Sequence, residues 1–270
     1  LSVFAVLIFA LSAFAIPDAH AASMTFSSNT ILTTSQTIGA GQTWTVNSGV
    51  TLTINPGVTI LVLSGGAITN SGTILNSGHI GIDGDIGNSG TITNSGTIDN
   101  AGNIFNFLGH SITNNGSILN SGHIGSDGTI NNNGAITNNG TIDNAGNLIN
   151  SLGHSITNNP GGIITVSNSG TTGITNSGTL TNSGTITISN SGTFSLGISN
   201  SGTLTNNPGG IITVSNSGTT GIINNGIINN SGTITISNSG SSTGIFNNPG
   251  NTINNNPGGI ITVSNSGVNG

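Results

Sequence analysis

The chain has 270 residues and contains no Lys, Arg or Glu, so its only ionisable side chains are six Asp and five His. Nucleic-acid binders need Lys or Arg to neutralise phosphate, and anionic membrane surfaces attract the same cations, so the composition argues against both kinds of partner. The absence of Cys excludes disulfides, thiolate zinc sites and cysteine nucleophiles, and we expect no cofactor.

Hydrophobic residues make up 32% of the chain and charged residues only 2%, against about 25% charged in ordinary domains. An unpatterned chain of this Gly, Asn, Ser and Thr content would be disordered, because it could not bury enough apolar area to offset its ordering entropy. Here the aliphatic residues recur at fixed intervals. The pattern predicts a thin, continuous core in place of a wide globular one.

Residues 1–21 have the features of a secretory signal peptide. An apolar run, "LSVFAVLIFALSAFAI", is followed by Pro17-Asp18 and by the small-x-small sequence "AHA". The run is shorter than the roughly 20 residues that span a bilayer, which disfavours the alternative of a membrane anchor. We therefore expect cleavage after Ala21 and a secreted or cell-surface protein.

Residues 22–66 are expected to form an N-terminal cap and the first coils. The stretch "QTWTVNSGVTLTINPGVTI" alternates apolar and polar residues with period two, between Asn-Ser-Gly and Asn-Pro-Gly turns. Its W-x-V segment, followed by "LTI-x-PG-V-x-I", resembles the opening coils of right-handed parallel β-helix proteins. That resemblance implies the same fold here.

Residues 67–157 repeat a hexad in which Gly stands two positions before an aliphatic residue. The aliphatic positions expected to form the core ladder are Ile68, Ile74, Ile80, Ile86, Ile92, Ile98, Ile104, Ile112, Ile118, Ile124, Ile130, Ile136, Ile142 and Ile156, with Leu148 in the same series. Two eight-residue steps interrupt the hexads and define a 44-residue unit, in which His79 recurs as His123 and Asp83 as Asp127. Such self-similarity is typical of a solenoid.

The hexad predicts an all-β fold, a single-stranded parallel β-helix or β-solenoid. Each hexad supplies one short strand with Ile inward and Thr outward, and successive coils stack at about 4.8 Å. Asn two residues after each Ile and Gly four residues after it should also lie inward. Stacked Asn side chains then form an asparagine ladder, and Asn and Gly bend the corners in left-handed conformation.

The number of sides stays open at this point. Three hexads per turn give a triangular coil of about 18 residues, but we count eight strands in the 44-residue unit, which does not divide by three, so two-sided coils of about 12 residues remain an alternative. The position of Gly relative to Ile and the resemblance of the first coils favour a right-handed helix.

Residues 158–270 carry a related block, "NNPGGIITVSNSG", three times, beginning at Asn158, Asn206 and Asn255. The chain stops within a repeat, at "SNSGVNG", so we expect the natural C-terminus to lie further on. The "NSGTI" arrays resemble the passenger or stalk regions of bacterial surface adhesins of the autotransporter and filamentous haemagglutinin-like kind. The resemblance implies a structural or adhesive rod, with surface glycans or other cell-surface molecules as partners, or end-to-end self-association.

Candidate chemistry is sparse. Asp83 and Asp85, at i and i+2, are expected to share one face of a strand with His79 nearby, as in a carbohydrate-active β-helix enzyme, although solvated turn carboxylates are the favoured interpretation. A metal site would require His79 and His123 to stack.

Two further alternatives are an ice-binding face and a self-assembling fibre. Thr185-Ile186-Thr187 and Thr203-Leu204-Thr205 are separated by the length of one triangular coil, which would place both segments on one face. An Asn-rich, nearly uncharged chain without Lys could stack end to end. The favoured function is attachment by a surface rod, and sites are expected at the exceptions to the hexad, such as the eight-residue steps at Phe105 to His110 and Ile149 to His154.

Overall fold

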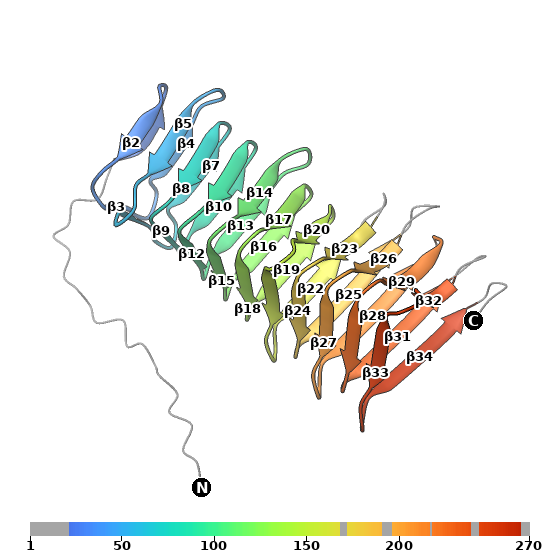
Figure 1. Ribbon diagram of the computed structural model, residues 1–270. Coiled ribbons are helices and arrows are strands. Elements are labelled where there is room, and N and C mark those ends of the chain that lie inside the picture. Colours follow the sequence, from blue (N-terminus) through green and yellow to red (C-terminus); the bar gives the residue numbers. More distant parts are fainter. Residues whose placement is uncertain (1–21, 168–171, 191–195, 217, 239–242, 266–270) are drawn as a thin grey trace, which may run out of the picture.

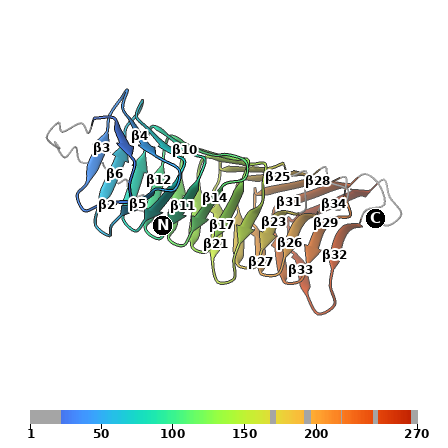
Figure 2. The ribbon, with the colours of Figure 1, turned by 90° about the horizontal axis from the view of Figure 1, so that it is seen from above.

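The computed structural model describes residues 22–167, 172–190, 196–216, 218–238 and 243–265, and within these ranges the regular elements are all β-strands. The strands stack as the rungs of one elongated body, in sequence order from blue to red (Figures 1 and 2). Among the described residues no helix occurs that could cross a bilayer. The predicted signal peptide and the last five residues lie outside the described ranges.

Each strand pairs in parallel with the third strand after it in the chain. The strands therefore form three sheets, here named A, B and C. Sheet A has 12 strands: β1 (Met24–Phe26), β4 (Thr43–Val46), β7 (Ala67–Asn70), β10 (Asp85–Asn88), β13 (Asn103–Asn106), β16 (His123–Ser126), β19 (Thr141–Asn144), β22 (Ile163–Val166), β25 (Thr185–Asn190), β28 (Ile211–Asn216), β31 (Thr233–Asn238) and β34 (Ile260–Asn265). Sheet B has 11: β2 (Thr30–Leu32), β5 (Thr51–Ile54), β8 (Thr73–Asn76), β11 (Thr91–Asn94), β14 (Ser111–Asn114), β17 (Thr129–Asn132), β20 (Leu148–Asn150), β23 (Thr172–Asn176), β26 (Leu196–Asn200), β29 (Thr220–Asn224) and β32 (Thr243–Asn247). Sheet C has 11: β3 (Gln36–Ile38), β6 (Thr59–Val62), β9 (His79–Ile82), β12 (Thr97–Asn100), β15 (Ser117–Asn120), β18 (Ala135–Asn138), β21 (Ser155–Asn158), β24 (Thr179–Asn182), β27 (Thr203–Asn206), β30 (Ile227–Asn230) and β33 (Thr252–Asn255).

The fold is therefore the predicted parallel β-solenoid, and its coils are three-sided. The two-sided alternative is wrong, because each hexad strand pairs with the third strand along the chain, as Ile86 pairs with Ile104. The count of eight strands per 44-residue unit is also wrong. One unit holds seven strands, β7 to β13, so the next unit begins with β14 on the neighbouring sheet. The right-handed sense stays a prediction.

Aliphatic side chains fill the axis of the solenoid. In-register pairing places Ile68, Ile86 and Ile104 directly over one another in sheet A. The fourteen isoleucines of the expected ladder are all at most 3% exposed. The core starts in the first coils, where Trp44 is fully buried and packs edge-to-face on Phe26 with ring centroids 5.3 Å apart.

Glycine is required at the hexad corners, but not for the left-handed backbone conformation that the sequence predicted. Left-handed backbone is confined to glycines of the longer steps, such as Gly109, Gly153 and Gly161, and the described hexad glycines are not left-handed. A Cβ on Gly90 would instead collide with the backbone carbonyl of Gly72 in the coil below. The hexad requires Gly because backbones approach closely at the corners. In the longer steps, turns such as Asn159 to Gly162 are closed by a 2.9 Å hydrogen bond from the Gly162 N–H to the Asn159 carbonyl.

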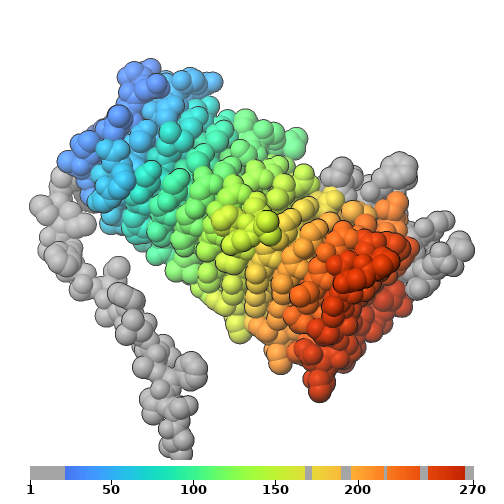
Figure 3. Space-filling model, viewed as in Figure 1, coloured from blue at the N-terminus to red at the C-terminus, as the bar shows by residue number. Residues whose placement is uncertain are grey.

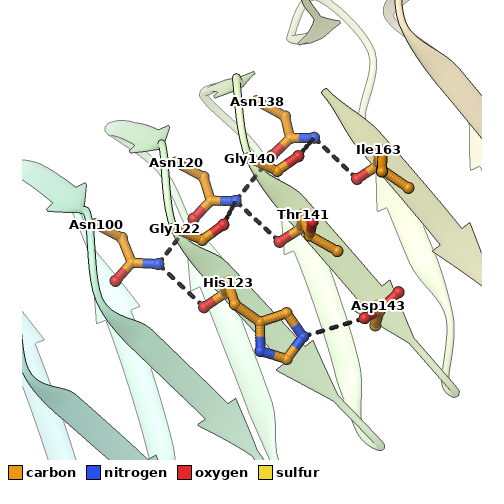
Figure 4. Close-up of polar contacts among 9 residues, drawn as sticks. All are labelled: Asn100, Asn120, Gly122, His123, Asn138, Gly140, Thr141, Asp143 and Ile163. Atoms are coloured by element: carbon orange, nitrogen blue, oxygen red, sulfur yellow. Dashed lines mark hydrogen bonds and ion pairs between the residues drawn. The ribbon is translucent and has the colours of Figure 1, made fainter. Parts of the chain in front are cut away.

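The predicted asparagine ladder is present. In sheet C, Asn120 Nδ2 donates to Asn138 Oδ1 of the next coil at 2.8 Å, to the Gly122 carbonyl at 3.2 Å and to the Thr141 carbonyl at 3.0 Å (Figure 4). Each such amide thus joins its own coil to the next coil and also bonds a backbone carbonyl of its own corner. The ladder of sheet B consists of Asn76, Asn94, Asn114, Asn132, Asn150, Asn176, Asn200, Asn224 and Asn247. The ladder of sheet C consists of Asn100, Asn120, Asn138, Asn158, Asn182, Asn206, Asn230 and Asn255.

Sheet A has a shorter ladder. Asn70, Asn88 and Asn106 are linked at 2.7 Å, and Asn106 Nδ2 then donates to Ser126 Oγ at 3.1 Å. Asn144 follows Ser126 in the same column, and Val166 follows Asn144. From there on the column is aliphatic, with Ile188, Val214 and Ile236 fully buried. The buried side chains of this column thus change from polar to aliphatic between Asn144 and Val166.

Candidate functional site

The structure separates two of the three residues proposed as a surface site. Asp83 lies at the corner after β9, whereas Asp85 is the first residue of β10 on the next sheet. The expectation that both carboxylates share one face of a strand is therefore wrong, because a corner falls between them. Asp85 Oδ1 instead accepts a 2.9 Å hydrogen bond from Asn103 Nδ2 in the coil above.

His79 and Asp83 do lie together, in a depression on sheet C that also includes Asp99. The depression has a volume of about 240 Å³, and its other lining residues are Leu61, Val62, Leu63, Gly81, Ile82 and Ala101. Asp99 joins the site because it stands one coil above Gly81 in the pairing of β9 with β12.

The same constellation recurs 44 residues later as a larger groove on sheet A, here named the Phe105 groove. It is lined by Phe105, Asn106, Phe107, His123, Gly125, Ser126, Asp127, Asp143, Asn144, Ala145, Thr165 and Ser167, and its volume is about 320 Å³. Phenylalanines replace Leu61 and Leu63, and Ser126 replaces Ile82. The groove adjoins the eight-residue step at Phe105 to His110, where the sequence predicted an exceptional site.

The two copies lie on different faces, because each 44-residue unit advances the chain by one sheet. His79 is in β9 of sheet C, and His123 is in β16 of sheet A. They do not stack, so the condition set for a histidine metal site is not met. The described residues hold no group of three or more His, Asp or other ligating side chains arranged for a metal ion.

The floor of the Phe105 groove is Gly125. The pairing of four strands places Phe105, Gly125, Asp143 and Thr165 in one outward column, so Gly125 leaves a gap between an aromatic ring and a carboxylate. His123 leans across this gap. Its Nε2 lies 3.1 Å from Asp143 Oδ2 (Figure 4), and its ring meets Phe105 edge-on with centroids 5.9 Å apart.

The contact between His123 and Asp143 orients the imidazole more than it stabilises the fold. The side chains of His123 and Asp143 are 34% and 51% exposed, so water screens their attraction. Asp127 and Asp143 supply carboxylate oxygens, which accept hydrogen bonds from hydroxyl groups.

A defect in the sheet A ladder lies behind the groove. Asn144 is 2% exposed, and neither its amide nitrogen nor its amide oxygen has a hydrogen-bond partner among the residues that the structure describes. The Ser126 hydroxyl below it donates to the Gly128 carbonyl at 3.2 Å instead, and Val166 above it has no polar side-chain atom. A buried amide left unpaired in this way costs about 1 to 3 kcal/mol.

The two Thr-x-Thr segments expected on one face are also on different sheets. Thr185 to Thr187 belong to β25 of sheet A, and Thr203 to Thr205 belong to β27 of sheet C. A separation of 18 residues does not return the chain to the same face here, because turns in this region are longer than three hexads, as shown by the hydrogen bond from Asn182 to Asn206 of the next coil.

No family model matches the chain. No curated protein matches it either. Among solved structures, the chain is similar to the crystal structure of a TibC-catalysed hyper-glycosylated fragment of TibA, with 22% sequence identity and a TM-score of 0.32. The similarity covers 92% of this chain and 100% of the TibA fragment.

Proposed function

We propose that the protein is a stiff rod, secreted or held at the cell surface, which presents the long faces of its β-solenoid for attachment. The supporting observation is the continuity of the three sheets, whose strands keep one parallel register from β1 to β34. In sheet A, 11 steps of about 4.8 Å between 12 strands give a length of about 53 Å.

Stiffness follows from three kinds of link between coils. Backbone hydrogen bonds join each coil to the next on all three sides, aliphatic side chains stack along the axis, and the asparagine amides connect consecutive corners. The space-filling view shows an unbroken surface over the coloured coils (Figure 3). A rod of this kind holds surface residues at fixed separations, which suits extended contact with a partner.

Export is part of the proposal and rests on the sequence of residues 1–21. Mass spectrometry of the mature N-terminus tests it. A mature chain beginning at Ala22 is the expected result, whereas retention of the apolar run would contradict export by signal peptide.

The attachment role is tested on the purified chain from residue 22 onward. Small-angle scattering and negative-stain electron microscopy are expected to show monomeric rods, and beads coated with the chain should adhere to cell surfaces better than beads coated with the same chain after denaturation. Thioflavin-positive fibrils that grow with protein concentration would favour the self-assembling fibre and overturn the proposal.

One observation favours ice binding as a second candidate. Thr165, Thr187, Thr213, Thr235 and Thr262 form a single outward column on sheet A, one per coil. Hydroxyl and methyl groups repeated at about 4.8 Å on a flat face could order water. A thermal hysteresis assay decides the matter, since absence of activity in the purified chain removes this candidate.

A further inference from the structure

We propose that the Phe105 groove binds an uncharged carbohydrate. This inference rests on the proposed function, attachment by a surface rod, and gives the class of ligand for that attachment.

The aromatic wall is exposed without an evident structural need. Phe105 and Phe107 are 38% and 48% exposed, although the hexad core is complete without them. Glycines beside them keep the surface open, because Gly87 lies next to the Phe107 ring and Gly125 next to the Phe105 ring. The face of an aromatic ring carries partial negative charge and attracts the polarised C–H groups of a sugar.

The opposite wall supplies groups that bind hydroxyls. Asp127 and Asp143 accept hydrogen bonds, and Thr165 and Ser167 can both donate and accept. The 3.1 Å contact between His123 and Asp143 orients the imidazole in the groove. Uronates and phosphorylated or sialylated sugars would face like charge here, and the chain has no Lys or Arg to attract them. The charges therefore favour a neutral glycan.

The ladder defect behind the groove is separate from the surface that would meet a ligand. Asp143 points outward and Asn144 points toward the axis, where it is 2% exposed and lacks a partner among the described residues. Asn100, its counterpart in the first copy, also has an amide oxygen without a partner among those residues. The surface that would bind a sugar therefore consists of the aromatic wall and the hydroxyl-binding groups of the opposite wall.

The first copy of the constellation lacks the aromatic wall and serves as an internal control. Leu61 and Leu63 stand at the wall positions, its volume is about 240 Å³, and Ile82 stands where the groove has Ser126. In that copy Asn100 Nδ2 is bonded to Asn120 Oδ1 at 2.7 Å, and Asn100 Oδ1 lacks a partner among the described residues. Because leucine occupies the wall positions there within the same fold, leucine is compatible with the solenoid at the phenylalanine positions.

The test measures binding of cellohexaose, maltohexaose, mannohexaose and xylohexaose, with hexagalacturonate as the acidic probe, by saturation-transfer NMR and titration calorimetry on the chain from residue 22 onward. We expect binding of at least one neutral hexasaccharide. The double variant Phe105→Leu/Phe107→Leu should weaken it at least about tenfold, as loss of central aromatic anchors does. The matched control, Leu61→Ala/Leu63→Ala in the first copy, should change it by less than about twofold, since residues outside a binding site are nearly neutral.

Ser126→Asn provides a second control, because residue 126 faces the axis of the solenoid. It supplies the missing ladder amide, so it should raise the unfolding midpoint while changing glycan binding by less than about twofold. A variant that merely damaged the fold would lower both.

Three outcomes would overturn the inference. They are absence of binding to every neutral probe, preference for hexagalacturonate, and unchanged binding in the double phenylalanine variant. Rods that still adhere to cells in any of these cases would leave the proposed attachment role standing, whereas wild-type chain that formed no rods would remove that role first.

Discussion

The asparagine ladders should carry a large share of the stability, and Asn138→Ala tests this in the middle of sheet C. Asn138 Oδ1 accepts from Asn120, and its Nδ2 donates to Asn158 Oδ1 at 2.8 Å and to the carbonyls of Gly140 and Ile163 at 3.0 Å each. Truncation leaves the fully buried Asn158 oxygen without its donor from the coil below. An orphaned buried acceptor costs about 1 to 3 kcal/mol and the small cavity adds to it, so we expect a loss of about 2 to 4 kcal/mol.

Urea denaturation followed by far-UV circular dichroism measures this loss. The control is Asn131→Ala, since Asn131 is a neighbouring asparagine on β17 that is only partly buried and carries no ladder bond; it should cost less than about 0.5 kcal/mol. Solenoids need not unfold in one step, so the emission of Trp44, the single Trp, reports separately on the first coils. Equal losses in the two variants would refute the claim that the ladder holds the coils together.

Three further predictions concern the corners, the ladder defect and the surface contact between His123 and Asp143. Gly90→Ala should lower the free energy of unfolding by about 3 kcal/mol or more in the same urea assay, because its Cβ meets the Gly72 carbonyl. Gly161→Ala should cost only about 1 to 2 kcal/mol, because the space around residue 161 is open and the penalty comes from its left-handed φ of 85° alone. Ser126→Asn should stabilise by about 1 kcal/mol, measured as a raised urea midpoint, because it gives Asn144 a partner; a lowered midpoint would contradict the account of the ladder defect. Asp143→Asn should change the free energy of unfolding by less than about 1 kcal/mol, since the pair with His123 is exposed, and a larger loss would mean that the pair is structural.

Much of the fold could be predicted because each hexad repeats the same local pattern of apolar, polar and glycine residues. Alternation around Ile68 or Ile86 indicates an inward side chain, and the six-residue period excludes a helix. The inward position of the Asn two residues later follows from the same alternation. Once Asn is inward, repetition alone provides its partner in the next coil.

The corners were harder to predict because their constraint acts between coils. Gly90 is needed on account of the Gly72 carbonyl, which lies one full turn earlier in the chain and directly beneath it in space. A local preference for left-handed backbone explains Gly161 but not Gly90. The two Thr-x-Thr segments lie on different sheets for a related reason, because the turn spanned by the ladder bond from Asn182 to Asn206 is longer than three hexads.

The Phe105 groove could have been found in part from the sequence. Aligning residues 61–101 with residues 105–145 shows that His79, Asp83 and Asp99 are kept, that Asp85 becomes Thr129, and that the two wall leucines become phenylalanines. The unpaired state of Asn144 could not be found this way. It requires knowing that the longer step places Ser126 directly above Asn106, and that Asn144 then lies above Ser126.

The length of the repeating unit decides where a duplicated site appears on the rod. A unit of six strands would return each copy to the same sheet, two coils higher, and would build a row of identical sites on one face. The unit here has seven strands, so the copy containing His79 lies on sheet C and the copy containing His123 lies on sheet A. Sites on different faces are not coupled through a shared ladder, so one copy can change without disturbing the other. That independence allows Leu61, Leu63 and Ile82 to remain aliphatic while Phe105, Phe107 and Ser126 form an open groove, and it explains how a monotonous repeat can hold a specialised site without interrupting the core beneath it.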